Sequence, residues 1–581
     1  MKQKKQFALL ASAVMVLTSA GCSPESPTSG GTGGGYHSTS VSSSRKVEKP
    51  EARSDIYTPA GEFPIVTERI SLTIFAPADG ENSRDENMLT QELEEMANID
   101  IVWQIASSGA FKEKMNLMFA SGELADIVAT GPSAEARISK EEEMNLGAQG
   151  LIIPLEDMVD DISTGYQEAF DRLPGLREYI TTPEGHIYTL PNVDGSLHIQ
   201  YNNKLWINTE WLKRLGLDMP ANTEDLYNVL KAFQEQDANG NGDTEDEIPL
   251  STCKNGTGVE IDGFLMNPFQ LTPESKMYLD EGKVVFAPVT DGYRDGLAYI
   301  HKLYEEGLIF PESFTQDREA QVKRNENGDA PVIGAFLAQR PGYACNLTTY
   351  PDNSRRWEQY QSVPPLAGPD GTVQSAWNPY AMYQTGVFAI TSACQYPEAA
   401  FRLADWLATE EGTLRSAEGP ENVGWRYAEE GELGLDGGQA LIAQLDTKPE
   451  NSGWGQLCGL IRTPELIAGY AVRQDPYGED VPPLQGRNIV LYQASLEHQD
   501  VAQPFESVLP DLYYPENQIE ELSMLKTTIL DYAKESTEAF ITGSKDLNRE
   551  WRSYVRQMDS IGLPDYLKMI QDAYDSSLFA G

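Results

Sequence analysis

The chain has 581 residues, of which 40% are hydrophobic and 9% aromatic, so it is long enough for two to four domains with a large core. Its 89 acidic residues against 44 basic residues give a net charge of −45. This charge excludes nucleic acid and anionic lipid surfaces as partners, because both attract a basic protein face. It suits an exported protein in water and leaves carboxylates available for cations.

The chain begins with a pattern typical of a secretory signal. Lysines within residues 1–5 precede an uncharged apolar run at 7–17, and small residues at 19–21 lead directly to Cys22. The run is too short for a membrane-spanning helix, which needs ~20 apolar residues. The sequence Ser-Ala-Gly-Cys resembles the lipobox of bacterial lipoproteins, although Ser19 stands where Leu is usual. We expect a signal peptide at 1–21 and a lipid on Cys22, with an ordinary signal peptide as the alternative.

Residues 22–65 are predicted to be a flexible tether. The segment 23–45 consists mainly of Ser, Gly, Thr and Pro and cannot build a core. A tether of this length reaches roughly 35 Å. Beyond residue 22 the sequence contains no apolar run that could cross a membrane, so we expect attachment to rest on the lipid.

An α/β region follows the tether. Alternating apolar residues from Ile70 predict a strand, and further strands are predicted at 100–104 and 126–129. Each pair of strands is separated by a helical stripe, the second of which ends at Gly122 as a C-cap. Strands that alternate with helices predict a parallel sheet, and ligands bind such sheets at the carboxyl ends of the strands.

In the remainder of the chain, predicted strands again occur together with helices, and the chain ends in helices. Asn208 is predicted to cap one helix and Thr223 the next, while Pro397 opens another. The last sixty residues carry long helical stripes that we assign to core packing. Four tryptophans on helices or next to a strand are also assigned to the core: Trp206, Trp211, Trp406 and Trp551.

Six segments in order resemble family 1 extracellular solute-binding proteins, in particular the large lipoproteins of carbohydrate ABC importers. They are residues 114–128, 150–159, 185–192, 205–233, 397–413 and 540–575. The resemblance implies a two-lobed periplasmic-binding-protein-like α/β fold with a ligand cleft and a helical C-terminal region. We place lobe 1 at 66–187 plus about 383–430, and lobe 2 at about 188–382 plus about 431–581.

The loop 237–247 predicts a calcium site. Oxygen-bearing side chains recur at every second residue, with a glycine at position 6, as in the first seven positions of an EF-hand loop. Position 12 is Ile248, so Glu247 at position 11 has to close the shell. The expected ligands are Asp237, Asn239, Asn241, Asp243, Asp246 and Glu247. Proteins similar to this one carry a D-x-N-G-N-G loop that binds structural calcium, whereas the alternative is an acidic surface turn.

Aromatic and planar polar side chains in loops are the candidates for binding a sugar, whose rings have apolar faces and hydroxyl edges. We expect about half of the candidate set to line the cleft and the rest to pack. The set is Trp377, Asn378, Trp425, Tyr343, Tyr201, Asn192, Asp194, Glu418 and Trp454.

The sequence carries no catalytic motif. Its five histidines form no H-E-x-x-H cluster, and it has no G-x-S-x-G element and no phosphate loop. Carboxylates alone cannot identify a glycosidase in so acidic a chain. Four cysteines after Cys22 show no C-x-x-C spacing, so we expect buried free thiols, and the sequence leaves a disulfide open: Cys253, Cys345, Cys394 and Cys458.

These observations predict a surface-anchored, monomeric substrate-binding lipoprotein that delivers an oligosaccharide to an ABC transporter permease. A separate ATPase would supply the transport energy, because this chain has no nucleotide motif. The alternative is a peptide or peptide-signal receptor with the same lobes, and a more remote one is an exported polysaccharide hydrolase or lyase.

Overall fold

The computed structural model describes residues 54–78, 83–347, 355–445, 448–477 and 483–580. Residues 52–581 form one contact unit. The predicted signal peptide, Cys22 and the predicted tether up to residue 53 lie outside the described residues. The prediction of a tether up to residue 65 was wrong for 54–65, because Ile56 and Ile65 are buried in the first hydrophobic core and Arg402 donates to the Thr58 carbonyl at 2.8 Å.

The first sheet confirms the predicted parallel α/β region. Among the described residues it has six strands in the order β14-β4-β11-β3-β1-β2. Strand β1 pairs in parallel with both β2 and β3, whereas β11 runs antiparallel to β3 and β4. The bounds are β1 (Ile70–Pro77), β2 (Ile99–Ala106), β3 (Ile127–Ala129), β4 (Leu190–Asp194), β11 (Tyr383–Ile390) and β14 (Ile461–Arg462).

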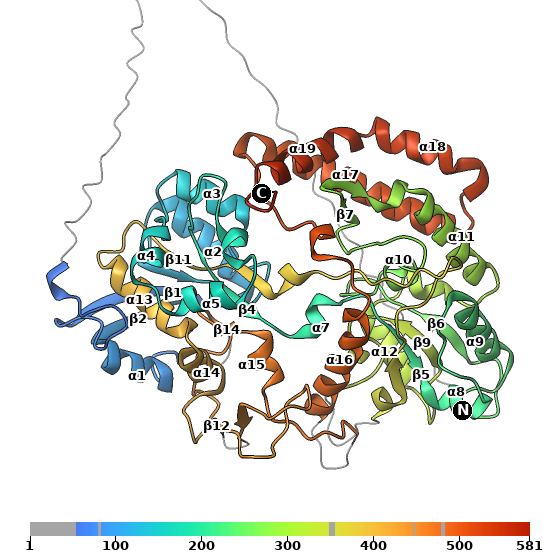
Figure 1. The fold of residues 1–581 in the computed structure, drawn as a ribbon, viewed down its shortest axis with the longest axis horizontal. Coiled ribbons are helices and arrows are strands. Elements are labelled where there is room, and N and C mark those ends of the chain that lie inside the picture. Colours follow the sequence, from blue (N-terminus) through green and yellow to red (C-terminus); the bar gives the residue numbers. More distant parts are fainter. Residues whose placement is uncertain (1–53, 79–82, 348–354, 446–447, 478–482, 581) are drawn as a thin grey trace, which may run out of the picture. The chain divides into compact units, whose positions relative to one another are not determined.

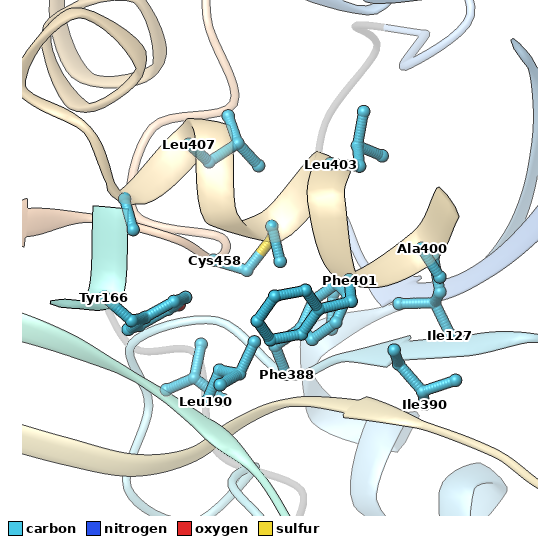
Figure 2. Packing of buried hydrophobic residues seen from close by; sticks show 14 of the residues in the cluster. Ile127, Tyr166, Leu190, Phe388, Ile390, Ala400, Phe401, Leu403, Leu407 and Cys458 are labelled. Carbon is cyan, nitrogen blue, oxygen red and sulfur yellow. The ribbon is translucent and has the colours of Figure 1, made fainter. Parts of the chain in front are cut away.

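Helices cover this sheet and complete the first hydrophobic core. The Gly122 C-cap follows α2 in the left-handed conformation, as predicted. Figure 2 shows Ala400, Phe401, Leu403 and Leu407 of α13 packed over Phe388 and Ile390 of β11. The helices are α1 (Met88–Ala97), α2 (Ser108–Ser121), α3 (Lys140–Ala148), α4 (Glu156–Ile162), α5 (Gly165–Arg172), α6 (Leu176–Ile180), α13 (Pro397–Ala408), α14 (Glu410–Glu418) and α15 (Pro464–Ala468). A small antiparallel pair, β12 (Trp425–Tyr427) and β13 (Ile442–Gln444), lies after α14 in the chain.

The second sheet has four strands among the described residues, in the order β10-β5-β9-β6. Strand β6 is parallel to β9, and β5 is antiparallel to both β9 and β10. The bounds are β5 (Leu205–Asn208), β6 (Ile248–Ser251), β9 (Ile333–Leu337) and β10 (Tyr360–Ser362). A hairpin of β7 (Met277–Asp280) and β8 (Lys283–Phe286) follows β6 in the chain.

A second hydrophobic core forms around this sheet and the C-terminal helices. Helices α17 and α18, in red, lie beside α11 in Figure 1, and their apolar faces join the core that contains Leu205 and Leu337. The helices are α8 (Thr209–Leu215), α9 (Thr223–Glu235), α10 (Ile261–Phe264), α11 (Asp291–Glu305), α12 (Arg318–Glu326), α16 (Pro483–Gln499), α17 (Glu516–Ile541), α18 (Leu547–Ser560) and α19 (Leu563–Asp575).

Local signals were predicted well, with one correction. Asn208 caps α8, as expected, and Gly216 ends this helix. The cap of α9 is Asn222 rather than Thr223, because the extended Asn222 lets its side chain accept from the backbone N–H groups of Glu224 and Asp225. Trp206, Trp211 and Trp551 are buried and Trp406 packs against the first core, while all four described cysteines are buried and free.

Three segments in the described part of the chain run between the cores of the two sheets and are called passages here. The first passage contains α7 (Leu197–Gln200), the second follows β10, and the third follows α16, with Val508 in the first core and Leu512 in the second. Strands β4 and β14 pair in the first sheet, although the predicted borders put 188–194 and 431–462 in lobe 2. These short strands take their place from pairing with β11 and with each other, which hydrophobic periodicity does not reveal.

Candidate functional site

The carboxyl ends of the parallel strands of the first sheet lie at one edge, where an α/β sheet binds ligands. Asp194 ends β4 and Arg462 ends β14, and the two residues are neighbours in the register of these strands. Arg462 Nη2 donates to Asp194 Oδ2 at 2.8 Å, and Ser196 Oγ donates to Asp194 Oδ1 at 2.7 Å. An ion pair therefore marks this edge next to the first passage.

The corresponding edge of the second sheet carries another polar group. Lys204, just before β5, accepts a backbone hydrogen bond of 3.1 Å from Ala338, just after β9. Arg340 follows two residues later, and the short helical turn Pro341–Tyr343 follows Arg340. The Tyr343 hydroxyl accepts from the Thr257 backbone N–H at 3.0 Å. Lys204, Arg340 and Tyr343 thus belong to the strand ends of the second sheet, where Lys204 is fully buried and its pKa is lowered to about 7 by burial.

His198, on α7 in the first passage, is influenced by charges from both edges. Burial and, after it, the positive charges of Lys204, Arg487 and Arg340 lower the pKa of His198 to about 4, while Asp194 opposes the shift. Helix α7 packs against α16, which carries Arg487. His198 is therefore a neutral imidazole at pH 7, able to donate and to accept hydrogen bonds.

A cavity of about 720 Å³ lies along the three passages. It is bounded by Trp377 and Asn378 from the second passage, Asp511 from the third, Glu141 of α3 and Lys526 of α17. Trp377 stacks on the buried Tyr201 ring at a centroid distance of 5.9 Å and an interplanar angle of 12°. Its indole N–H donates to the Gln503 carbonyl at 2.8 Å. The aromatic stack joins all three passages.

The loop 237–247 folds back on its own backbone. The side chains of Asp237, Asn239 and Asn241 accept from the backbone N–H groups of residues 242, 241 and 243, at 3.0, 2.9 and 2.7 Å. The Asp246 carboxylate accepts from the side-chain amides of Asn239 and Asn241 at 2.9 and 2.7 Å. These contacts hold the loop oxygens within one tight turn.

Two carboxylate oxygens of this loop are buried and have no hydrogen-bond partner: Asp237 Oδ1 and Glu247 Oε2. Burial raises the pKa of Glu247. In the described part of the chain, no group of three His, Cys, Asp or Glu side chains is arranged to hold a metal ion. The side-chain oxygens of this loop come partly from asparagines, and the Asp246 carboxylate already accepts hydrogen bonds from loop amides. The two orphaned oxygens fit a hard cation, because an unpaired buried carboxylate oxygen is costly without one.

Comparison with known proteins agrees with the two-lobed fold. Residues 80–414 match the family described as bacterial extracellular solute-binding protein. The chain belongs to this family. No helix in the described segments is long and apolar enough to cross a membrane.

Several members of the solute-binding family are similar along most of this chain. The fructooligosaccharide ABC transporter substrate-binding protein FusA of Streptococcus pneumoniae is 28% identical over 500 residues, covering 84% of this chain and 87% of FusA. A structure of an EF-hand mutant of FusA with fructo-nystose has a TM-score of 0.61 at 25% identity, covering 87% of this chain and 99% of that one. The HMO-binding solute-binding protein of Bifidobacterium longum infantis has a TM-score of 0.70 at 21% identity, with coverages of 88% and 99%.

Within this solute-binding fold, the candidate ligand residues fall into three groups. Asp194 and Tyr343 lie at the strand ends, whereas Trp377, Asn378 and Tyr201 belong to the passages; Asn378 caps a short turn through its contact with the Tyr380 N–H at 3.1 Å. The third group, Trp425, Glu418, Trp454 and Asn192, makes internal contacts in the first lobe.

Of the nine candidates only Trp377 and Asn378 line the described cavity, so the third group is absent from it, as are Asp194, Tyr343 and Tyr201. Trp454 is buried and its indole N–H donates to Thr90 Oγ1 at 2.9 Å. The Trp425 indole donates to the Gly419 carbonyl at 3.1 Å, and the Glu418 carboxylate accepts from the Tyr470 hydroxyl at 3.0 Å. The Asn192 side-chain oxygen accepts from the Leu460 N–H at 3.0 Å and so links β4 to the residue directly before β14. Each polar atom that a sugar would use is engaged inside the protein.

The sequence prediction did not include the basic residues Lys204, His198, Arg340 and Arg487. One signal could have found Arg340, since it stands directly before the Pro341-Gly342 turn and cations are scarce in this chain. Arg487 carries no comparable signal, because it reaches His198 only through the packing of α16 against α7.

Proposed function

We propose that this protein captures an oligosaccharide between its two lobes and delivers it to the permease of an ABC importer. The observation that carries the proposal is the cavity of about 720 Å³ along the passages between the lobes, which Trp377, Asn378 and Gln200 line. Three passages allow the lobes to close over a solute by hinge bending. FusA, which is named as a fructooligosaccharide-binding protein, supports a carbohydrate solute.

Thermal shift of the full-length protein against a panel of oligosaccharides and peptides tests this function. A ligand that binds only the folded state adds RT ln(1 + [L]/Kd), about 2.7 kcal/mol at a hundredfold excess over Kd. For a chain of this length we expect a rise in Tm of roughly 2 °C or more. Stabilisation by peptides and by no oligosaccharide would replace this function with peptide capture. Turnover of a polysaccharide by the purified protein would show that it is an enzyme.

We also propose that calcium holds the loop 237–247 in a structural role. The buried, unpartnered Asp237 Oδ1 and Glu247 Oε2 support it, and so does the similarity to FusA, one structure of which is described as an EF-hand mutant. Asp237, Asn239, Asn241, Asp243, Asp246 and Glu247 would hold the ion. A bound cation would offset the repulsion among the loop carboxylates and fix the turn between α9 and β6.

Attachment through a lipid on Cys22 completes the proposal. Its support is the pattern of residues 1–22 in the sequence, and the residue itself lies outside the described part of the structure. A tether that ends before residue 54 would leave the lobes free to move while the protein stays near its permease as a monomer.

A further inference from the structure

A second cavity, of about 240 Å³, lies in the second lobe. Thr252 and Cys253, which follow β6 in the chain, line it together with residues of α10 and α17. Ligands of α/β sheets bind at the carboxyl ends of the strands, and β6 ends at this place. The second cavity therefore has a position in the second sheet that suits a ligand.

This second cavity adjoins the cavity of about 720 Å³ along the passages, called the passage cavity below. Glu274 and Leu530 line both cavities. The Glu274 side chain is exposed, and its carboxylate accepts from Asn202 Nδ2 at 3.0 Å. An exposed side chain changes rotamer within nanoseconds and without disturbing the core. A chain-like ligand can therefore pass Glu274 from one cavity into the other.

Helix α17 forms a common wall of the two cavities. Ile519, Lys526 and Leu530 line the passage cavity, and Leu530, Lys534 and Glu538 line the second cavity. Their spacing of three, four or seven residues places them on one face of the helix. The helical rise per residue makes this stretch roughly 28 Å long. Together the two cavities follow one long helix face, so they suit an elongated ligand.

The inner wall of the second cavity is a buried polar network. Lys276 Nζ and the Tyr293 hydroxyl both donate to Asp262 Oδ2, at 2.8 and 2.6 Å. The Tyr293 hydroxyl also lies 2.9 Å from Thr537 Oγ1 of α17, and Asp262, Tyr293 and Thr537 are buried. These bonds order the wall before any ligand arrives, which lowers the entropic cost of binding.

Glu260 is the group on this wall that lacks a partner. Its Oε2 atom is buried and accepts no hydrogen bond from the described residues, while Lys276 donates to Asp262 instead. Burial raises the pKa of Glu260, and the charge of Lys276 only partly opposes the shift. A buried carboxylate oxygen without a donor costs free energy. A ligand hydroxyl would supply the missing donor.

The charges of the second cavity favour a neutral, hydroxylated ligand. Lysines and carboxylates both line it: Lys254, Lys276 and Lys534, against Glu260, Asp262, Glu274 and Glu538. A charged ligand of either sign would meet groups of its own sign, whereas a hydroxyl group donates to carboxylates and accepts from ammonium groups. The apolar side chains of Phe314 and Leu530 in the same lining suit the faces of a sugar ring.

We propose that the second cavity is a further subsite for the solute, which is a neutral oligosaccharide whose chain passes Glu274 and ends against Glu260. This inference rests on the proposed function. A short oligosaccharide fills the passage cavity alone, and only a longer one reaches Glu260. Hydrogen bonds to a charged acceptor are roughly twice as strong as neutral ones, so the last ring adds affinity. Chain length thereby becomes a determinant of specificity.

The test measures affinity against chain length by calorimetry on the full-length protein purified in detergent. The probes are ladders of neutral oligosaccharides, from disaccharide to octasaccharide, built from fructose, glucose, xylose or mannose. We expect the affinity within at least one ladder to rise at least tenfold at the length that reaches the second cavity and then to level off.

Variants locate this gain. Glu260→Ala should weaken binding of the long oligosaccharide at least tenfold and leave the short one within twofold. Glu260→Gln keeps an acceptor without the charge, so its affinity for the long chain should lie between those of the natural protein and Glu260→Ala. Glu535→Ala removes a carboxylate at an exposed position of α17 outside both linings, and should change neither affinity by more than twofold.

A readout on the natural protein does not depend on how well a variant folds. The free thiol of Cys253 belongs to the second cavity, whereas that of Cys345 lies outside both cavities. At equal saturation, the long oligosaccharide should slow alkylation of Cys253 relative to Cys345, and the short one should not. Peptide mass spectrometry measures the two rates.

An affinity that is independent of chain length would overturn the subsite, and so would a length gain that survives Glu260→Ala or leaves Cys253 alkylation unchanged. If oligosaccharides of every length fail to bind, the proposed function itself fails. A peptide ladder run in parallel covers the alternative, since a length gain with peptides alone would replace the sugar and the proposed function together. The failure of the subsite and the failure of the function are therefore distinguishable.

Discussion

The Tyr513 hydroxyl donates a 2.9 Å hydrogen bond to the carboxylate of Glu143, joining the third passage to α3. The other carboxylate oxygen accepts from Thr189 Oγ1 at 2.7 Å. Nearby, Lys140 Nζ donates to the Tyr179 and Asp511 carbonyls, both at 2.8 Å. This buried polar network fixes the third passage to the first lobe at the point where the chain leaves for α17.

Glu143→Gln is predicted to remove a pH dependence of folding. Burial raises the pKa of Glu143 to about 7, from 4.5 in the unfolded chain. Between these values the folded state binds more protons than the unfolded state, so stability falls as pH rises through this window. Relative to the Gln variant, the free energy of unfolding of the natural protein should fall by roughly 1–3 kcal/mol from pH 4.5 to pH 7.5.

Denaturant unfolding at several pH values measures this difference. Glu113→Gln, at an exposed position on α2, is the matched control and should follow the natural protein at every pH. Parallel stability curves for the natural protein and Glu143→Gln would show that the network does not titrate.

Removal of calcium is predicted to lower the Tm. A chelator would leave the carboxylates of the loop 237–247 unscreened, and added calcium should restore the loss through its binding energy. Asp237→Asn and Glu247→Gln should abolish the response to calcium, because they alter the two buried oxygens that have no partner. Glu245→Gln removes a charge from the same loop at an exposed position and should keep the response. A Tm that ignores both chelator and calcium would rule out the site.

Trp454→Phe is predicted to reduce stability without changing solute affinity. The Trp454 ring is 4% exposed and packs edge-on against Trp103 at 5.1 Å. The change removes ring volume and leaves Thr90 without its indole donor, which should lower the free energy of unfolding by about 1–3 kcal/mol. Calorimetry with an established oligosaccharide ligand provides the second readout. A tenfold loss of affinity would show that Trp454 contributes to ligand binding.

Trp454 also illustrates what the sequence could and could not predict. Periodicity predicted β1, β2, β3 and the helices between them, because each apolar stripe is a local property. Whether a loop tryptophan faces a solute or the core depends on a partner such as Thr90, which lies far away in the chain. The same holds for Arg487, which lies near His198 only because α16 packs against α7. Sequence patterns therefore predicted elements better than the residues that converge between them.

Cys22→Ala is predicted to release the protein into the medium with unchanged solute affinity. A single acyl chain holds a protein only weakly, so stable attachment needs the several chains that lipoprotein processing adds at this cysteine. Without the thiol no chain can be added, and the sequence between Cys22 and residue 54 has no apolar segment to replace it. Ser19→Leu places the usual lipobox residue before the same cysteine and should keep the protein on the membrane. Fractionation of cells with labelled palmitate distinguishes the variants, and a Cys22→Ala protein that remains on the membrane would show that attachment does not depend on this cysteine.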